Sequence, residues 1–256
     1  VLVFSLTRLA LALRVGGEAD WTVGTFFSVA AFGLLYDLTT ALLLALPFGL
    51  WLTVLPERWV RFRATRLLIG LALASGIFAL LFNAAAEWLF WDEFSSRFNF
   101  IAVDYLVYTN EVIGNIRQSY PAGWILGGLG GLALLGTLAV RRRMMQQLAA
   151  VAPFKSRLIG FAVHALLALG LLAVVSGDAR ENLQNAYARE LAGNGPFELV
   201  RAFKNNELEY QRFYPTLPEQ VVYARLREEI LLTGGEPLST DPHDLRYRVT
   251  GQGREL

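Results

Sequence analysis

Residues 22–55 read TVGTFFSVAAFGLLYDLTTALLLALPFGLWLTVL, and Asp37 is the only charged residue among them. A helix that crosses the hydrocarbon core of a bilayer needs about 20 predominantly apolar residues. Lipid offers no hydrogen-bonding partner to an open backbone, so an uninterrupted apolar run of this length is typical of a transmembrane helix. The stretch therefore predicts a helical membrane protein.

This stretch is longer than one straight span requires, and it allows two interpretations. It could form two short helices that break near Tyr36 and Asp37, or one long helix that Pro47 bends. We favour one span with an interfacial lead-in.

Other parts of the chain have the same apolar character. Glu87 is the one charge in the third apolar stretch, residues 67–91. The fourth and fifth stretches, residues 122–140 and 158–176, contain no Asp, Glu, Lys or Arg. The first stretch is short and contains Arg8; because the chain opens on Val1 rather than Met, we expect its start to be incomplete. A signal peptide is the alternative for this first stretch. The five expected spans are residues 1–14, 22–55, 67–91, 122–140 and 158–176.

The expected fold class is therefore all-α, with a polytopic membrane domain of about five transmembrane helices over residues 1–176. Residues 177–256 follow as an extracytoplasmic helical connector. Composition agrees, because 54% of the residues are hydrophobic and 18% are charged, which excludes a disordered chain. The absence of cysteine excludes a disulfide scaffold and a thiolate metal site, and a net charge of +1 gives no reason to expect a nucleic-acid partner.

Two clusters of basic residues predict the orientation. One lies between the second and third spans and the other between the fourth and fifth, so both are on one side, which the positive-inside rule makes cytoplasmic. The loop 92–121 and everything after Ser176 are then expected outside. Tryptophans at the span edges agree with these boundaries, although scattered core tryptophans are the alternative reading. The clusters are Arg58, Arg61, Arg63 and Arg66, and Arg141, Arg142, Arg143, Lys155 and Arg157.

The outer loop 92–121 contains an amphipathic pattern. Read as one helix over Phe98–Tyr120, it places apolar residues such as Ala102 and Tyr105 on one face and polar residues on the other. Such a helix could lie on the membrane surface, where the polar face would meet a lipid headgroup, a sugar or a neighbouring domain. The alternative is a solvated face on a packed loop helix. The candidate contact residues on the polar face are Asp104, Tyr108, Glu111 and Asn115.

Asp37 is the one acid deep inside an apolar run, and intramembrane charges are functional candidates by default. Its simplest structural partner is Arg8 in the first span, so we treat Arg8 and Asp37 as a candidate intramembrane polar pair. His164 in the fifth span has no neighbouring ligand pattern, and we expect a hydrogen-bonded core histidine. Two histidines and no cysteine argue against a zinc site.

The tail reads as polar helices separated by turn residues. Asp178–Ala192 is expected to be helical, Gly193-Asn194-Gly195-Pro196 to end that helix and restart the chain, and a later helix to end at Gly234. A core of useful size cannot be built from this tail alone. It is therefore expected either to connect to something else or to cap the membrane domain.

Three segments resemble lipoteichoic-acid-synthase-like proteins, which are membrane-anchored members of the sulfatase/alkaline phosphatase superfamily and include phosphoglycerol transferases. The segments are GLLYDL at Gly33–Leu38, SSRFNFIAVDYLVYTNEVIGNIRQSYP at Ser95–Pro121, and ELAGNGPFELVRAFKNNELEYQRFYPTL at Glu190–Leu217. The likeness extends over essentially the whole chain.

The resemblance implies an anchor in a bacterial cytoplasmic (inner) membrane, followed by an extracytoplasmic catalytic domain that this chain lacks. In that family a threonine nucleophile and a divalent metal, Mn or Mg, act in the catalytic domain. No catalytic or metal-binding residue is carried over to this chain, and no cofactor is expected in it. The implied partners are the lipid bilayer, a phospholipid donor, an envelope glycan acceptor and the protein's own C-terminal catalytic domain.

Two other functions are consistent with the sequence. A small transporter or channel subunit could use Asp37 and His164 as a polar path, although no inverted repeat is visible. A non-catalytic membrane scaffold or sensor could bind a partner through its tail.

Overall fold

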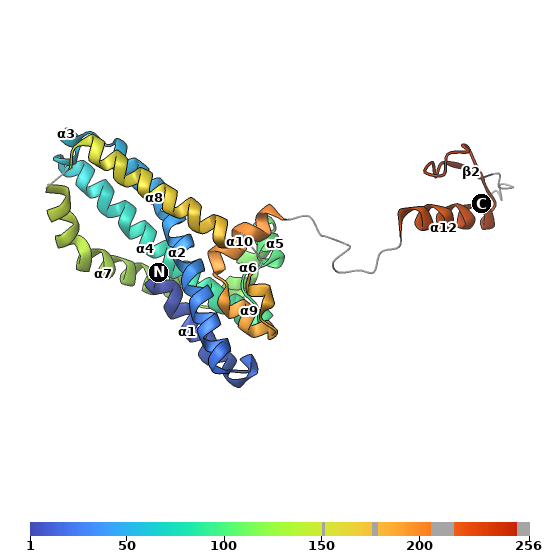
Figure 1. The fold of residues 1–256 in the computed structure, drawn as a ribbon, viewed down its shortest axis with the longest axis horizontal. Coiled ribbons are helices and arrows are strands. Elements are labelled where there is room, and N and C mark those ends of the chain that lie inside the picture. The colour runs from blue at the N-terminus through green and yellow to red at the C-terminus, as the bar shows by residue number, and fades with distance from the viewer. Residues whose placement is uncertain (150–151, 176–178, 206–217, 250–256) are drawn as a thin grey trace. The chain divides into compact units, whose positions relative to one another are not determined.

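The computed structural model describes residues 1–149, 152–175, 179–205 and 218–249 of the chain (Figure 1). The chain divides into two compact units, Val1–Asn206 and Glu207–Leu256, and each is described by itself. In its described parts, all regular elements of the first unit are helices. Its elements are α1 (Leu2–Val15), η1 (Gly16–Ala19), α2 (Val23–Val54), α3 (Glu57–Val60), α4 (Arg63–Phe94), α5 (Phe100–Val107), α6 (Thr109–Ser119), α7 (Ala122–Ala149), α8 (Phe154–Val175), η2 (Ala179–Asn182), α9 (Ala186–Ala192) and α10 (Gly195–Lys204).

Among the described residues, four helices are long and apolar enough to cross a membrane, namely α2, α4, α7 and α8. The protein is accordingly an all-α, multi-pass membrane protein. We expected about five spans, and the difference lies in α1. At about 1.5 Å per residue, its 14 residues reach about 21 Å, which is less than the hydrocarbon core of roughly 30 Å.

Helix α2 is one continuous helix of 32 residues with Pro47 inside it. Thr22 caps its first turn by accepting a hydrogen bond from the backbone N–H of Thr25 at 3.0 Å. The buried hydroxyls of Thr40 and Thr53 donate to carbonyls one turn earlier, at 2.8 Å each. These polar side chains are therefore satisfied within the helix, as an apolar environment requires.

The four long helices pack as two pairs, α2 with α8 and α4 with α7 (Figure 1). At one end, which we call the arginine end, α3 joins α2 to α4. Leu55, Val60 and Ile69 form a small core there, and Met144 of α7 packs against it. Arg157 at the start of α8 donates to the carbonyls of Leu52 and Leu55 at 2.8 and 2.7 Å. Both basic loops predicted from the sequence therefore lie at this end.

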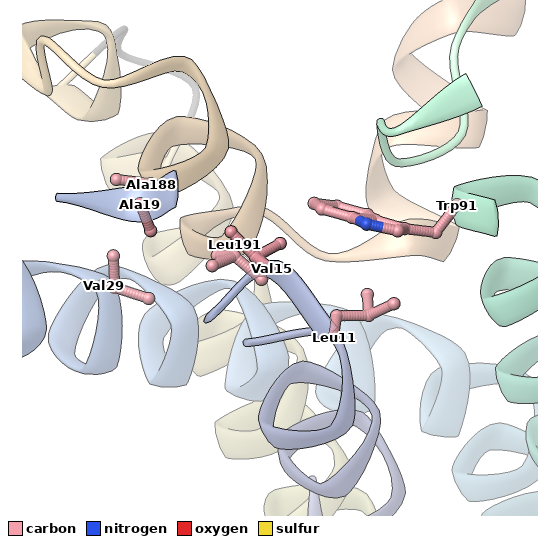
Figure 2. Close-up of a cluster of buried hydrophobic side chains, with 7 residues drawn as sticks. All are labelled: Leu11, Val15, Ala19, Val29, Trp91, Ala188 and Leu191. Carbon is pink, nitrogen blue, oxygen red and sulfur yellow. The ribbon is translucent and has the colours of Figure 1, made fainter. Parts of the chain in front are cut away.

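At the opposite end, η2, α9 and α10 fold back onto the helices, and we call these three elements the cap. Leu191 of α9 is fully buried in a cluster with Leu11, Val15, Trp91 and other residues of α1, η1, α2 and α4 (Figure 2). Burying a leucine side chain contributes about 1.5–3 kcal/mol. The first unit thus includes α9 and α10, which the sequence analysis had assigned to the connector.

The outer loop does not form the single helix expected over Phe98–Tyr120. It forms α5 and α6, which are separated at Tyr108, where φ is −94° and ψ is 45°. Ala102 of α5 is buried with Phe90 and Phe98, and Leu199 of α10 packs against this group. The break allows α5 to pack against the cap, whereas the described side chains of α6 are exposed or half-buried.

The second unit is small. It contains α12 (Glu219–Leu232), β1 (Gly235–Pro237) and β2 (Tyr247–Val249), and the two strands pair antiparallel with Glu236 opposite Arg248. Gly234 turns the chain from the helix into β1 with a φ of +81°, a conformation that glycine adopts without strain.

Candidate functional site: a buried clamp between the cap and the membrane helices

The first of three buried ion pairs found among the described residues joins α1 to α2. Arg8 and Asp37, which the sequence analysis paired, lie in contact, and Asp37 is fully buried. The hydroxyl of Ser5 donates to the second carboxylate oxygen of Asp37 at 3.1 Å. Arg8 also donates to the carbonyl of Gly33 at 2.8 Å. The charges of both residues are therefore compensated within the fold.

The turn between α9 and α10 is bound to this pair. Residues 191–195, which we call the cap turn, are all buried. Arg8 donates to the carbonyls of Leu191 and Gly193, the second at 2.7 Å. The Asn194 side chain donates to Asp37 at 2.9 Å, while its carbonyl oxygen accepts from the backbone N–H of Phe197 at 3.3 Å. Asn194 therefore caps α10 and holds the turn on α2 at the same time.

The second ion pair joins α4 to the segment before α5. Glu87 and Arg97 are in contact, and each side chain is only 2% exposed. Arg97 also binds α9, because its Nε donates to the Glu190 carbonyl at 2.6 Å and its backbone N–H donates to the Glu190 carboxylate at 2.9 Å. The outer loop and the cap are thereby held together by one arginine.

The third ion pair lies within the cap. Arg180 of η2 and Glu198 of α10 are 2.8 Å apart, and the Arg180 guanidinium lies over the Tyr36 ring at 5.4 Å. The Tyr36 hydroxyl donates to the Val175 carbonyl at 3.2 Å, and its ring meets Phe197 edge to face. Burial raises the pKa of Glu198 above its ordinary value, and the nearby Arg180 partly opposes that shift.

Each ion pair has a glycine against it. A Cβ at Gly33 would collide with the Arg8 guanidinium, one at Gly193 with Arg180, and one at Gly195 with the Glu87 carboxylate. Close approach of backbone to side chain at these three positions explains why the cap turn contains two glycines around Asn194. We call the three ion pairs, the cap turn and these glycines the clamp.

The clamp is suited to holding elements together. Its carboxylates each face a guanidinium, and removing one partner of a buried pair is strongly destabilising. Among the residues that the structure describes, no group of three His, Cys, Asp or Glu side chains could hold a metal ion. The arrangement therefore fixes the position of the cap on the membrane helices.

The other residues predicted from the sequence lie elsewhere. Asp104 of α5, Tyr108 at the break and Asn115 of α6 are exposed, and the side chain of Glu111 lies outside the described residues. His164 of α8 has its Nε2 3.0 Å from the Leu42 carbonyl, which is the hydrogen-bonded core position expected for it. None of these four described residues contacts the clamp in the hydrogen bonds and ion pairs of the described chain.

Sequence reasoning missed most of the clamp. Glu87 is visible as a charge near the end of an apolar run, and that signal could have drawn attention to it. Asn194 lies in a Gly-Asn-Gly-Pro sequence that was interpreted only as a helix stop. Arg97, Arg180 and Glu198 carry no local signal, because their partners are distant in the chain.

Comparison of the chain with protein-family models, with curated proteins and with solved structures finds no match.

Proposed function

We propose that this chain is the membrane anchor and juxtamembrane part of a lipoteichoic-acid-synthase-like enzyme of the sulfatase superfamily. The enzyme would transfer phosphoglycerol or a related phospho-group from a phospholipid donor onto a cell-envelope glycan. One observation carries the proposal: all three segments that resemble that family contribute to the clamp. Gly33 and Asp37 lie in the first segment, Arg97 in the second and Asn194 in the third.

The clamp suggests what the anchor does. Because α9 and α10 are fastened to α1, α2 and α4, the chain leaves the cap from a fixed point at the end of the membrane helices. A catalytic domain that follows would be held near lipid-borne substrates, which raises their effective concentration. A Mn or Mg ion would belong to that catalytic domain.

We further propose that the arginine end faces the cytoplasm of a bacterial cell and the cap end faces outward across the inner membrane. The positive-inside rule supports this orientation.

The orientation can be tested by cysteine labelling. The chain contains no cysteine, so a single introduced cysteine is its sole thiol. Exposed Ser119 at the end of α6 and exposed Ser156 at the start of α8 are suitable sites. In intact cells a membrane-impermeant maleimide should label Ser119→Cys, and Ser156→Cys only after permeabilisation. The reverse pattern would contradict the orientation.

The enzymatic part is tested on the natural protein. Its mass in membranes of the source cells should be well above 28.4 kDa, roughly double, as a catalytic domain of ordinary size requires. That protein, reconstituted with Mn or Mg, should release diacylglycerol from phosphatidylglycerol. A mass near 28.4 kDa would favour a scaffold or a transporter instead.

The residues Asp104, Tyr108, Glu111 and Asn115, of which the first two and the last are exposed, are proposed to contact a lipid headgroup or the catalytic domain. Replacing Asp104, Glu111 and Asn115 together with alanine in the natural protein should lower transfer while the protein remains folded. Unchanged transfer would exclude this role.

A further inference from the structure

A pocket of about 270 Å³ lies between α4 and α7, which pack side by side (Figure 1). Both helices are membrane-spanning candidates, so the pocket opens towards the acyl chains of the bilayer. Ser75 contributes the one polar side chain of its lining. The lining residues are Ala74, Ser75 and Phe78 of α4 and Gly130, Ala133 and Leu134 of α7.

Exposed leucines extend the pocket towards the arginine end. Leu67 and Leu71 lie on the same face of α4 as the pocket residues, and Leu138 lies one turn after Leu134 on α7. Each of these four leucines is at least 50% exposed. We call the pocket and these leucines the apolar track.

The apolar track ends at two arginines, one on each helix. Arg63 precedes Ala74 by 11 residues on α4, and Arg141 follows Gly130 by 11 residues on α7. Eleven residues make about three helical turns, so each arginine lies on the pocket face of its helix, about 17 Å along the axis from the pocket. That distance is close to half the thickness of the hydrocarbon core, which is about 30 Å.

The positive charge at this end is not balanced within the protein. Glu57 is the one acid against nine basic residues in the segments 55–66 and 141–157. The three arginines of the clamp each face a carboxylate. Arg63 and Arg141, in contrast, are exposed and form no ion pair within the described parts of the chain. A ligand with anionic groups would supply the missing counter-charges.

The ligand that matches both features has an anionic head and an apolar tail. A nucleic acid or a free phosphate has no apolar part to occupy the track, and a purely apolar ligand leaves the arginines unpaired. Basic sites between membrane helices are suited to lipid headgroups such as that of cardiolipin. A headgroup with two phosphates can engage both arginines at once, which raises its affinity over that of a headgroup with a single phosphate.

From these observations we propose that α4 and α7 together bind a lipid with two phosphates, of the cardiolipin type. Its phosphates pair with Arg63 and Arg141, and an acyl chain follows the apolar track into the pocket. The lipid joins α7 to α4 at the arginine end, whereas the clamp lies at the opposite end of the membrane helices. The site does not depend on the proposed enzymatic function, because none of its residues lies in the three segments that resemble the enzyme family.

The headgroup is tested with the whole chain in phosphatidylethanolamine nanodiscs that contain cardiolipin or phosphatidylglycerol at equal total phosphate. Native mass spectrometry measures the lipid that the chain retains, and cardiolipin should be preferred. The double variant Arg63→Gln/Arg141→Gln should weaken cardiolipin binding roughly thirtyfold, the combined effect of two basic residues next to an anionic lipid.

The matched control for the headgroup is Arg61→Gln/Arg143→Gln, which removes the same charge. Arg61 and Arg143 are exposed, and Arg143 lies on the opposite face of α7 from Leu134. This control should retain cardiolipin nearly as well as the unaltered chain does. An equal loss in both double variants, no loss in either, or equal retention of phosphatidylglycerol and cardiolipin would overturn the proposal.

The acyl chain is tested separately with Gly130→Leu, which fills the pocket. A Cβ at Gly130 meets no atom within 4 Å, so the substitution is accommodated without a backbone clash. It should weaken cardiolipin retention, whereas Gly128→Leu, on the opposite face of α7 and equally open, should not. Unchanged retention in Gly130→Leu would overturn the placement of the acyl chain. Displacement of cardiolipin by an excess of inorganic phosphate would assign the arginines to a free anion and overturn the lipid as the ligand.

Discussion

Asn194 donates its side-chain amide to Asp37 over 2.9 Å and so joins two residues that are 157 positions apart in the chain. Asp37 lies within α2, one of the membrane-spanning helices. Asn194 lies in the turn between α9 and α10, which follow the spanning helix α8 in the chain. This bond is one of several that join the cap to the buried ion pairs, together with those from Arg8 to the carbonyls of Leu191 and Gly193. The strength of that connection can be measured residue by residue.

Replacing Asp37 with asparagine should destabilise the first unit by about 3 kcal/mol, because Arg8 then stays buried without a counter-charge. Thermal unfolding of the purified chain in detergent measures the loss. Asp104→Asn, at an exposed acid of α5, is the control and should be close to neutral. An equal stability of the two variants would show that the ion pair contributes nothing.

Asn194→Ala should cost about 2 kcal/mol, because it removes both a helix cap and a hydrogen bond to a buried carboxylate. Asn194→Asp keeps the cap but places a second carboxylate against Asp37, so it should be the more damaging variant. Hydrogen exchange of the α10 amides, followed by mass spectrometry, reports the effect locally. The opposite ranking would mean that capping outweighs the bond to Asp37.

Gly195→Ala should destabilise the clamp by about 2 kcal/mol, because the new methyl group collides with the Glu87 carboxylate. The matched control is Gly130→Ala in α7, where a Cβ meets no atom within 4 Å. Chemical denaturation of both variants provides the comparison. Equal tolerance of the two substitutions would contradict the close approach at Gly195.

The raised pKa of Glu198 has a consequence for stability. The folded chain binds the proton of Glu198 more tightly than the unfolded chain does, so the contribution of this group is greatest below its ordinary pKa of 4.5. That contribution falls as the pH rises through the raised value. Melting temperatures measured from pH 4.5 upwards, through the raised pKa, should fall in the unaltered chain and fall less in Glu198→Gln. Identical profiles would argue against a raised pKa.

In the second unit, hydrogen bonds from Arg246 lower the pKa of the Asp244 carboxyl to about 2. Arg246→Ala should return this pKa towards its ordinary value of 3.8. An NMR titration of the labelled aspartate carboxyl carbons resolves the difference. Arg248→Ala is the control for a general change in charge and should leave the Asp244 titration in place.

The long helices could be predicted from the sequence, since an apolar run such as Val23–Val54 has few other stable states in a bilayer. The Arg8–Asp37 contact could also be predicted, because a charged residue in an apolar run needs a partner of opposite charge. The cap turn could not, because Gly193 and Gly195 are also what a simple turn between helices requires. Only the fold brings Glu87 against Gly195.

The break at Tyr108 shows another limit. The apolar and polar positions of Phe98–Tyr120 fit one helix, and nothing in the local pattern indicates an interruption. What decides the interruption is packing, because Ala102 and Phe98 join a core with Phe90 of α4. Tertiary contacts of this kind override local periodicity.

The clamp also sets an order of events during synthesis. Arg8 and Asp37 emerge from the ribosome early, whereas Asn194 follows Asp37 by 157 residues and Gly193 follows Arg8 by 185. At typical elongation rates, roughly 10–30 s pass between the synthesis of Asp37 and that of Asn194, its last hydrogen-bond partner. The nascent helices must therefore be inserted with a buried polar site still incomplete. The final assembly of the cap end is a late, post-insertion step in the biogenesis of this protein.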